Sequence, residues 1–310
     1  MIVSLTANTT LDLTLFVPSF GMNRTIRATR TVQSMGGKPT DASWILGEMG
    51  IPSMALGFAA GAIGRKVESL LRQKGVSHDF IEVGGETRIN TVIVSEDGSG
   101  QSVITTSTLE IDPAHLDALR AKFESALDTA TAVVLGGTLP RAISPAFYTE
   151  FIGIAKGRGI PVIFDADEPN LSAGLVAQPD YIKPNHHELG ALMGREINTL
   201  QAAYEAGRKI IHDYGTCPII TLAGEGGLAV LPDRAYHIPP LVIEVVSAAG
   251  AGDGVLAGIT YACANDLPIE EGLRLGFACA AAVCLQPGTA DCRKADVERF
   301  LPIIELVPYR

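Results

Sequence analysis

The sequence predicts an α/β protein with a doubly wound parallel sheet, helices on both faces of that sheet, and a second, small sheet beside it. Short runs rich in β-branched residues alternate with longer stretches in which apolar residues recur every three or four positions. This alternation is typical of strand–helix–strand units. Two other segments, about 12–35 and 86–107, are extended and place polar residues at every second position. That alternation is typical of a small sheet with one face in water.

The main elements follow one another in order along the chain. Strands of the main sheet are expected at Ile2–Ala7, Ser53–Phe58, Ala132–Leu135, Pro161–Phe164, Tyr181–Lys183 and Pro218–Leu222. Helical spacing of apolar residues marks Asp112–Thr129, Ser144–Arg158 and Leu200–Tyr214. Because no internal repeat or low-complexity tract interrupts this order, we expect residues 1–310 to form a single domain.

Composition excludes several classes of protein. The 310 residues carry a formal net charge of −10, which disfavours non-specific attraction to nucleic acid or to an anionic membrane. The N-terminal stretch lacks the basic region of a signal peptide, and no apolar run reaches the ~18 residues of a membrane span. We therefore expect a cytoplasmic protein without a nucleic-acid or membrane partner. An anionic ligand would have to be held by a few local cations and backbone amides.

The strongest motif is a glycine turn that opens a helix. Residues 246–254 read Val-Ser-Ala-Ala-Gly-Ala-Gly-Asp-Gly, and an apolar helical run follows. Gly250 and Gly252 let successive N–H groups point into one space, and the helix adds its positive N-terminal end. This is a candidate anion hole with Asp253 in the first helical turn. The same residues would also suit an ordinary helix start.

A second glycine turn and a short polar segment hold further candidate ligand groups. Gly36-Gly-Lys-Pro-Thr-Asp41 opens a helix, and Pro39 suits its first turn. Asn185 and Glu188 are three residues apart and so share one face of a helical turn. An amide and a carboxylate placed in this way could hold Mg²⁺ through water, or could simply cap the helix.

Two strand ends complete the set of candidates. Residues 221–230 read as a strand, a glycine loop and a second strand, which is either a shelf for a nucleotide or a plain hairpin. Residues 134–140 end a strand in small side chains. Open α/β sheets bind ligands at the carboxyl ends of their strands, so both segments are expected near a site.

Eight short motifs occur in the same order as in a known family and span nearly the whole chain. They are Leu5-Thr-Ala-Asn8 with Leu11-Asp12, Asn23-Arg24, Gly36-Gly-Lys38, Thr87-Arg-Ile-Asn90, Gly137-Thr-Leu-Pro140, Lys183-Pro-Asn185 with Glu188, Gly250-Ala-Gly-Asp253 and Gln286-Pro-Gly-Thr289. With these motifs the sequence resembles the ribokinase-like (PfkB) carbohydrate kinases. Within that family it is similar to the sugar-phosphate branch, which contains 6-phosphofructokinases, 1-phosphofructokinases and tagatose-6-phosphate kinases. The resemblance implies a doubly wound α/β/α core, a small β-sheet lid formed by the segments 12–35 and 86–107, and often a homodimer through the lid.

The resemblance also implies roles for individual residues. Asp253 is expected to be the general base toward a sugar hydroxyl that attacks the γ-phosphate of ATP, and the amides of Gly250, Ala251 and Gly252 are expected to stabilise the transferred phosphoryl group. Asp12, Gly37 and Asp41 correspond to sugar-binding positions, whereas Lys38, Arg88 and Asn90 correspond to the site of a substrate phosphate. The expected nucleotide-binding residues are Lys183, Asn185, Thr221, Gly224 and Gly226. Asn185 and Glu188 are the candidate Mg²⁺ residues, expected to hold the ion through water.

The sequence departs from the family pattern at the sugar-binding turn. The family usually reads Gly-Gly-Lys-Gly-x-Asn, whereas this chain has Pro39 and Asp41. An ionised Asp41 would accept hydrogen bonds from hydroxyls, could not donate them, and would repel a nearby phosphate. Thr105 to Thr108 also replace a usual Pro-Gly pair after the second lid strand, so the contacts to the sugar are expected to differ there.

Three functional hypotheses follow from these observations. The leading hypothesis is an ATP- and Mg²⁺-dependent kinase that phosphorylates a primary hydroxyl of a ketohexose monophosphate, such as fructose 6-phosphate, fructose 1-phosphate or tagatose 6-phosphate. Asp41 favours the alternative of an unphosphorylated sugar, a sugar acid or a nucleoside as acceptor. A non-catalytic sugar or nucleotide sensor on the same fold is the third hypothesis, and the intact Asp253 argues against it.

Overall fold

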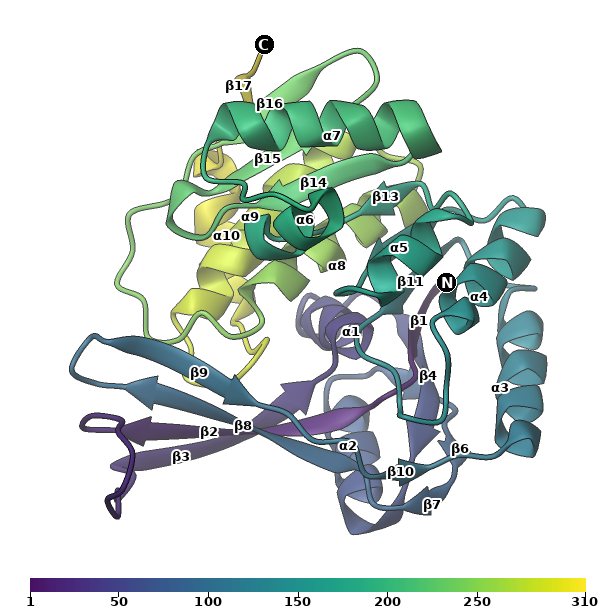
Figure 1. The fold of residues 1–310 in the computed structure, drawn as a ribbon, viewed down its shortest axis with the longest axis vertical. Helices are drawn as coiled ribbons and strands as arrows, with labels where there is room; N and C mark the ends of the chain where they lie inside the picture. Colours follow the sequence, from purple (N-terminus) through teal and green to yellow (C-terminus); the bar gives the residue numbers. More distant parts are fainter.

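The computed structural model describes residues 1–310, and most of them surround one large mixed sheet (Figure 1). Its strand order is β17-β16-β15-β14-β13-β12-β11-β1-β4-β5, and β6 also pairs with β4. The parallel part consists of β1 (Ile2–Thr6), β4 (Ser53–Ala59), β5 (Ser77–His78), β6 (Ile81–Glu82), β11 (Ala132–Gly136), β12 (Val162–Asp165), β13 (Tyr181–Ile182) and β14 (Cys217–Thr221). The antiparallel extension consists of β15 (Gly227–Val230), β16 (Ala235–Ile238) and β17 (Val307–Pro308).

Helices cover both faces of this sheet, as the α/β prediction requires. One face carries α3 (Pro113–Ala126), α4 (Ala146–Gly157), α5 (Asn170–Leu175), α6 (His186–Met193) and α7 (Leu200–Tyr214). The other face carries α1 (Lys38–Glu48), α8 (Ala251–Ala264), α9 (Ile269–Cys284) and α10 (Lys294–Phe300). The remaining helices are α2 (Gly61–Gln73), which contacts β5 and β2, and the 3₁₀ turns η1 (Ala223–Glu225) and η2 (Leu301–Ile303).

The buried strands divide the core into two parts because successive side chains point to opposite faces. Val3 and Leu5 belong to a cluster of 36 buried residues on one face, whereas Ile2 belongs to a cluster of 28 on the other. On the second face α8 and α9 pack at glycine contacts, since a Cβ at Gly258 would overlap the backbone of Gly276. This close packing fixes the position of α8, whose first turn holds Asp253.

A separate small sheet combines the two alternating segments of the sequence. Its order is β3 (Arg30–Gly36), β2 (Thr10–Val17), β8 (Arg88–Ser95) and β9 (Gly100–Ile104). In Figure 1 this small sheet extends from the lower side of the main body, and a two-stranded pair, β7 (Gly84–Gly85) with β10 (Leu109–Glu110), lies near its base. The parallel register of β2 and β8 sets Asp12 beside Asn90 and Thr10 beside Arg88.

The order of the main sheet reverses beside its first strand. The chain leaves β1 for β4 on one side, then crosses to β11 on the other side and continues through β12, β13 and β14. Such a switch point leaves a crevice at the carboxyl ends of the two strands, where α/β folds bind ligands. No helix in the structure is long and apolar enough to cross a membrane.

Candidate active site

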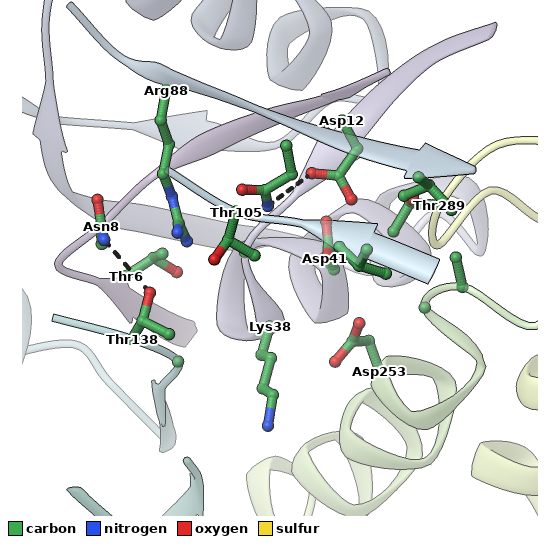
Figure 2. A pocket seen from close by; sticks show the side chains of 17 residues that line it. Thr6, Asn8, Asp12, Lys38, Asp41, Arg88, Thr105, Thr138, Asp253 and Thr289 are labelled. Atoms are coloured by element: carbon green, nitrogen blue, oxygen red, sulfur yellow. Dashed lines mark hydrogen bonds between the residues drawn. The ribbon is translucent and has the colours of Figure 1, made fainter. Parts of the chain in front are cut away.

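A cavity of about 270 Å³ lies between the switch point of the main sheet and the inner face of the small sheet (Figure 2). Only 3 of its 17 lining residues are hydrophobic. The cavity is lined by Thr6, Asn8, Asp12, Gly37, Lys38, Asp41, Arg88, Asn90, Val92, Val103, Thr105, Gly137, Thr138, Ala249, Gly250, Asp253 and Thr289. Every predicted substrate-binding residue is in this set, together with Gly250 and Asp253.

The glycine turn before α8 has the geometry of an anion hole. Gly250 caps the helix in a left-handed conformation with φ 81°, and a Cβ there would clash with the backbone of Ala290. Ala251 N–H donates to Ala248 O at 3.3 Å, whereas the N–H groups of Gly250 and Gly252 make no hydrogen bond within the protein. Two free amides at a helix N-terminus are available to an anion.

Asp253 lies in the first turn of α8 and is 8% exposed. Burial, together with the carboxylates of Asp165 and Asp12, raises the pKa of Asp253, while Lys183 and Lys38 oppose the shift. A carboxyl group whose pKa is raised toward neutrality is a better proton acceptor at neutral pH than an exposed aspartate. The side chain is therefore suited to general-base chemistry.

Two other carboxyl groups stand near Asp253. Asp12, on β2, accepts a hydrogen bond from Nδ2 of Asn90 at 3.1 Å, and burial raises its pKa to about 6. Asp41, in the first turn of α1, is 2% exposed. Burial raises the pKa of Asp41 well above its usual range, and the neighbouring Asp253 and Asp12 add to this shift. We call these three residues, Asp12, Asp41 and Asp253, the acidic end of the pocket.

Arg88 forms the opposite side of the pocket, beside Asn8 and Thr138 in Figure 2. Its side chain is buried at 7% exposure, and one terminal nitrogen donates to Thr106 O at 3.1 Å. No carboxylate forms an ion pair with it, and Nε has no hydrogen-bond partner. Burial of the charge lowers the pKa of Arg88. A buried, unpaired guanidinium is costly on its own and favours an anionic ligand.

Lys38 lies in the pocket wall, but its ammonium group is already paired. It binds Asp165 at 3.0 Å and Glu188 at 2.8 Å, and Lys183 binds the other oxygen of Asp165 at 2.9 Å. These contacts tie the start of α1 to the ends of β12 and β13 and to α6. The structure thus separates Lys38 from Arg88, with which the sequence grouped it as a phosphate ligand. That role of Lys38 stays a prediction.

The predicted nucleotide residues lie outside this cavity, along the carboxyl ends of β13 and β14. Thr221 ends β14 and pairs with Asn185 in an isolated bridge. Gly224 is in η1 and Gly226 follows it with φ 81°, so this loop turns β14 back into β15 as a hairpin. Lys183 approaches Gly252, where a Cβ would meet Nζ at 3.2 Å. The group therefore runs from the anion hole outward along the sheet edge.

The Asn185–Glu188 pair forms a complete helix cap. Asn185 Oδ1 accepts from the backbone amides of His187 and Glu188, each at 2.9 Å, and Glu188 Oε2 accepts from Asn185 N at 2.8 Å. The second oxygen of Glu188 binds Lys38. With these oxygens already engaged, the pair does not fit direct ligation of a metal, and no cluster of three or more His, Cys, Asp or Glu side chains in the structure does so either.

Several residues in or beside the pocket have no role assigned from the sequence. Asp165, which binds Lys38 beside the pocket, is the last residue of the buried strand β12, and a carboxylate at a strand end is a readable signal for a site at a sheet edge. Thr6, Asn8, Thr138 and Thr289 lie within the family-like motifs, but nothing local marks them as lining residues. Asn8 Nδ2 donates to Thr138 Oγ1 at 3.3 Å, which joins the ends of β1 and β11 across the switch point.

Comparison with known proteins places this geometry in context. The model of the pfkB family of carbohydrate kinases matches residues 3–296. A 1-phosphofructokinase of Bacillus subtilis is 29% identical over 308 residues, which cover 99% of each chain. A 1-phosphofructokinase of Vibrio cholerae is 31% identical over 291 residues, which cover 93% of this chain and 90% of the relative.

Solved structures share the whole fold. Phosphofructokinase-2 from Escherichia coli, in complex with substrates and products, superposes with a TM-score of 0.88 at 25% sequence identity, covering 98% of this chain and 99% of that one. The similarity therefore includes both the main sheet and the small sheet.

Proposed function

The chain belongs to the pfkB family of carbohydrate kinases, and on that premise we propose that it phosphorylates a primary hydroxyl of a ketohexose monophosphate with ATP. Fructose 1-phosphate is the first acceptor to test, because both curated relatives described above are named 1-phosphofructokinase. Fructose 6-phosphate and tagatose 6-phosphate belong to the same proposal.

Arg88 is the observation that carries the choice of a phosphorylated acceptor. It is the pocket's buried cation without an ion pair, and it stands across the cavity from Asp253. A ketohexose monophosphate bears its phosphate on one terminal carbon and a free primary hydroxyl on the other. Such a molecule can set its phosphate against Arg88 while its hydroxyl reaches Asp253. A guanidinium grips phosphate through parallel hydrogen bonds, which also orients the sugar.

The residues of the acidic end then supply the chemistry. As the sugar oxygen forms its bond to the γ-phosphorus, the bond from that phosphorus to the β,γ-bridging oxygen breaks and ADP leaves. Asp253 accepts the proton of the attacking hydroxyl. The free amides of Gly250 and Gly252 donate to the charge that develops on the transferred group. Asp12, held by Asn90, accepts a hydrogen bond from another sugar hydroxyl.

We assign ATP to the edge of the main sheet that leads away from the anion hole. The expected nucleotide-binding residues follow this edge, so a nucleotide there would direct its phosphates toward Gly250. These residues are Lys183, Asn185, Thr221, Gly224 and Gly226. Mg²⁺ would enter with those phosphates, whose charge it neutralises, since this ion keeps most of its waters and binds substrate phosphates. Asn185 and Glu188 would reach it only through water.

A homodimer through the small sheet is part of the same proposal. β9 is an edge strand whose five residues are all exposed, including the apolar Val103 and Ile104. An exposed apolar edge favours pairing with a second chain. Light scattering after gel filtration should give twice the mass of one chain, and Ile104→Lys should lower it to that of a monomer. A monomeric wild type would overturn this part.

The test of the proposed activity is ADP release over a panel of acceptors. Fructose 1-phosphate, fructose 6-phosphate and tagatose 6-phosphate are compared with fructose, ribose and nucleosides under one set of conditions. We expect turnover with a phosphorylated ketose at a kcat/KM at least ~100-fold above that of its unphosphorylated counterpart, because the charged contact to Arg88 is lost in the latter. Turnover confined to uncharged acceptors would refute the proposal.

A further inference from the structure

Asp41 occupies a position in which an ionised carboxylate is poorly stabilised. Its side chain is 2% exposed, lines the pocket, and lies between Asp12 of the small sheet and Asp253 of α8 (Figure 2). Its atom Oδ1 is buried and has no hydrogen-bond partner. The residue therefore brings a third carboxyl group, with one unused polar atom, into a space that already holds two.

No cation compensates this carboxyl group. Lys38, on the same helical turn, binds Asp165 and Glu188 instead, and Lys183 binds Asp165. Arg88 donates to Thr106 O on the far side of the pocket. The groups that favour an Asp41 anion are the N-terminus of α1 and the backbone amide of Gly37, and they are outweighed by burial and by the two carboxylates.

The carboxyl group of Asp253 lies close enough to that of Asp41 to raise the pKa of Asp41. Two buried carboxyl groups in such proximity can share a hydrogen bond only when one of them carries a proton. Asp253 is the partner whose negative charge is favoured by Lys183 and Lys38, whereas Asp41 has no such support. The proton therefore belongs to Asp41, and Asp253 keeps the charge that a base requires.

We infer that Asp41 is a protonated carboxylic acid in the working enzyme and donates a hydrogen bond to a hydroxyl of the acceptor sugar. In the free enzyme this proton is shared with Asp253, and the acceptor hydroxyl takes its place when the pocket fills. Asp41 thus provides a donor, as the usual asparagine of this turn does with its amide. The identity of the acceptor rests on the proposed function, whereas the protonation of Asp41 does not.

Protonation of Asp41 removes the conflict between this residue and a phosphorylated acceptor. An ionised Asp41 would repel a phosphate and so favour an uncharged acceptor. A neutral carboxylic acid has no such effect, and it can both donate and accept. The acidic residue at this position is then compatible with a sugar-phosphate substrate.

The protonation state can be measured without any substrate. The infrared difference spectrum between wild type and Asp41→Asn at neutral pH should contain the carbonyl stretch of a protonated carboxylic acid, and this band should vanish only at alkaline pH. Asp97→Asn is the matched control, since Asp97 is exposed and hydrogen bonds from Ser99 lower its pKa. Its difference spectrum should contain carboxylate bands alone. Carboxylate bands alone for Asp41 at neutral pH would overturn the inference.

The donor role is tested by pH profiles of kcat/KM with whichever acceptor the panel identifies. Asp41→Ala should lie about 10- to 100-fold below Asp41→Asn at neutral pH, because only asparagine restores a donor. Because Asp41 must keep its proton to donate, kcat/KM of the wild type should decline at alkaline pH, and this decline should be absent in Asp41→Asn. The acidic limb of the profile should stay in place in Asp41→Asn because one neutral group replaces another. Equal activities of the two variants, or an acidic limb moved to lower pH in Asp41→Asn, would overturn the role.

The proposed function and the inference about Asp41 can be refuted independently of each other. If no phosphorylated ketose is turned over, the proposed function is wrong, yet the infrared band still decides the protonation of Asp41. If the panel identifies such an acceptor and the band is missing, only the inference about Asp41 is wrong.

Discussion

The two ends of the pocket carry opposite charges and are built in different ways. The acidic end gathers Asp12, Asp41 and Asp253 from three elements, β2, α1 and α8, and places them close enough to perturb one another. The opposite end relies on Arg88 alone, held by one hydrogen bond to a backbone carbonyl. At the acidic end three carboxyl groups lie together without a cation paired to them. At the other end a single guanidinium lies without a carboxylate paired to it.

The difference shows how one small cavity can provide a proton acceptor at one end and an anion-binding group at the other. Burial raises the pKa values at the acidic end, and neighbouring carboxylates add to the shifts of Asp41 and Asp253, so a proton acceptor is available there. Burial without repulsion at the other end leaves Arg88 charged and in need of an anion. In the proposed function, the first arrangement performs the chemistry, and the second fixes the orientation of the acceptor on which it is performed. Substitutions at the two ends should therefore affect different kinetic constants.

The largest effect is expected at Asp253. Asp253→Asn removes the proton acceptor while keeping the shape of the side chain, so kcat should fall by about 10²- to 10⁴-fold. ATP affinity, measured by calorimetry, should change little. The control is Asp97→Asn, which removes an exposed carboxylate in the turn between β8 and β9, outside the pocket. Unaltered turnover of Asp253→Asn would remove the acidic end from the chemistry and would revive a sensor role.

Substitution of Arg88 should produce the next largest effect, and this effect should appear in kcat/KM for the phosphorylated acceptor. Arg88→Ala should lower kcat/KM for the phosphorylated acceptor by about 10- to 100-fold, the value of a charged hydrogen-bond contact. The loss should be much smaller for the same sugar without its phosphate. Arg88→Lys should fall between the two because it keeps the charge but not the planar fork. Equal losses for both acceptors would mean that Arg88 supports the fold rather than the phosphate.

The sequence predicted local features of this site better than its distant contacts. The glycine turns before α1 and α8 and the cap at Asn185 are formed by neighbours in the chain, so their patterns could be read directly. The parallel strands could be recognised from their continuous burial, as in Ala132–Gly136. The alternation of polar residues in β8 likewise predicted a strand with one polar face, and Arg88 and Asn90 lie on that face.

The partners of the charged residues could not be predicted, because folding brings them together from far apart. Lys38 was expected to hold a phosphate, yet its carboxylate partner Asp165 is 127 residues away in the chain. The pairing of Asp41 with Asp253 depends on how α1 packs beside α8, which no local pattern encodes. Burial at such a contact changes the protonation state of a side chain, and the sequence gives only its residue type.

The pH profile of activity should test the electrostatic coupling within the acidic end. Asp253 must be ionised to accept a proton and its pKa is raised, so kcat should decline up to tenfold per pH unit below that pKa. Asp12→Asn removes a negative neighbour, lowers the pKa of Asp253, and should move this acidic limb to lower pH. Arg158→Ala, which removes a surface arginine paired with Asp128, should leave the limb in place. A limb that does not move in Asp12→Asn would contradict the coupling.

The smallest effect concerns stability, and it arises because burial disfavours the negative charge of Asp12. The folded-state pKa of Asp12 is about 6, above the ordinary value of 3.8, so the folded protein binds its proton more tightly than the unfolded chain does. By linkage, the penalty is absent below about pH 4 and is complete above about pH 6. Asp12→Asn should therefore raise the free energy of unfolding by about 1–2 kcal/mol at pH 8, less than the ~3 kcal/mol upper bound set by the shift, since the amide satisfies its neighbours imperfectly.

Thermal or denaturant unfolding at two pH values measures this effect. The gain of Asp12→Asn over wild type should appear at pH 8 and shrink toward zero at pH 4, while kcat/KM falls because a sugar hydroxyl loses its charged acceptor. Asp97→Asn again serves as the control, and its sign should be opposite because hydrogen bonds from Ser99 lower the pKa of Asp97. A gain of equal size at both pH values would mean that packing, rather than charge, limits stability at the acidic end. A stability that falls at pH 8 would show that Asp12 is held by more favourable contacts than its single bond to Asn90.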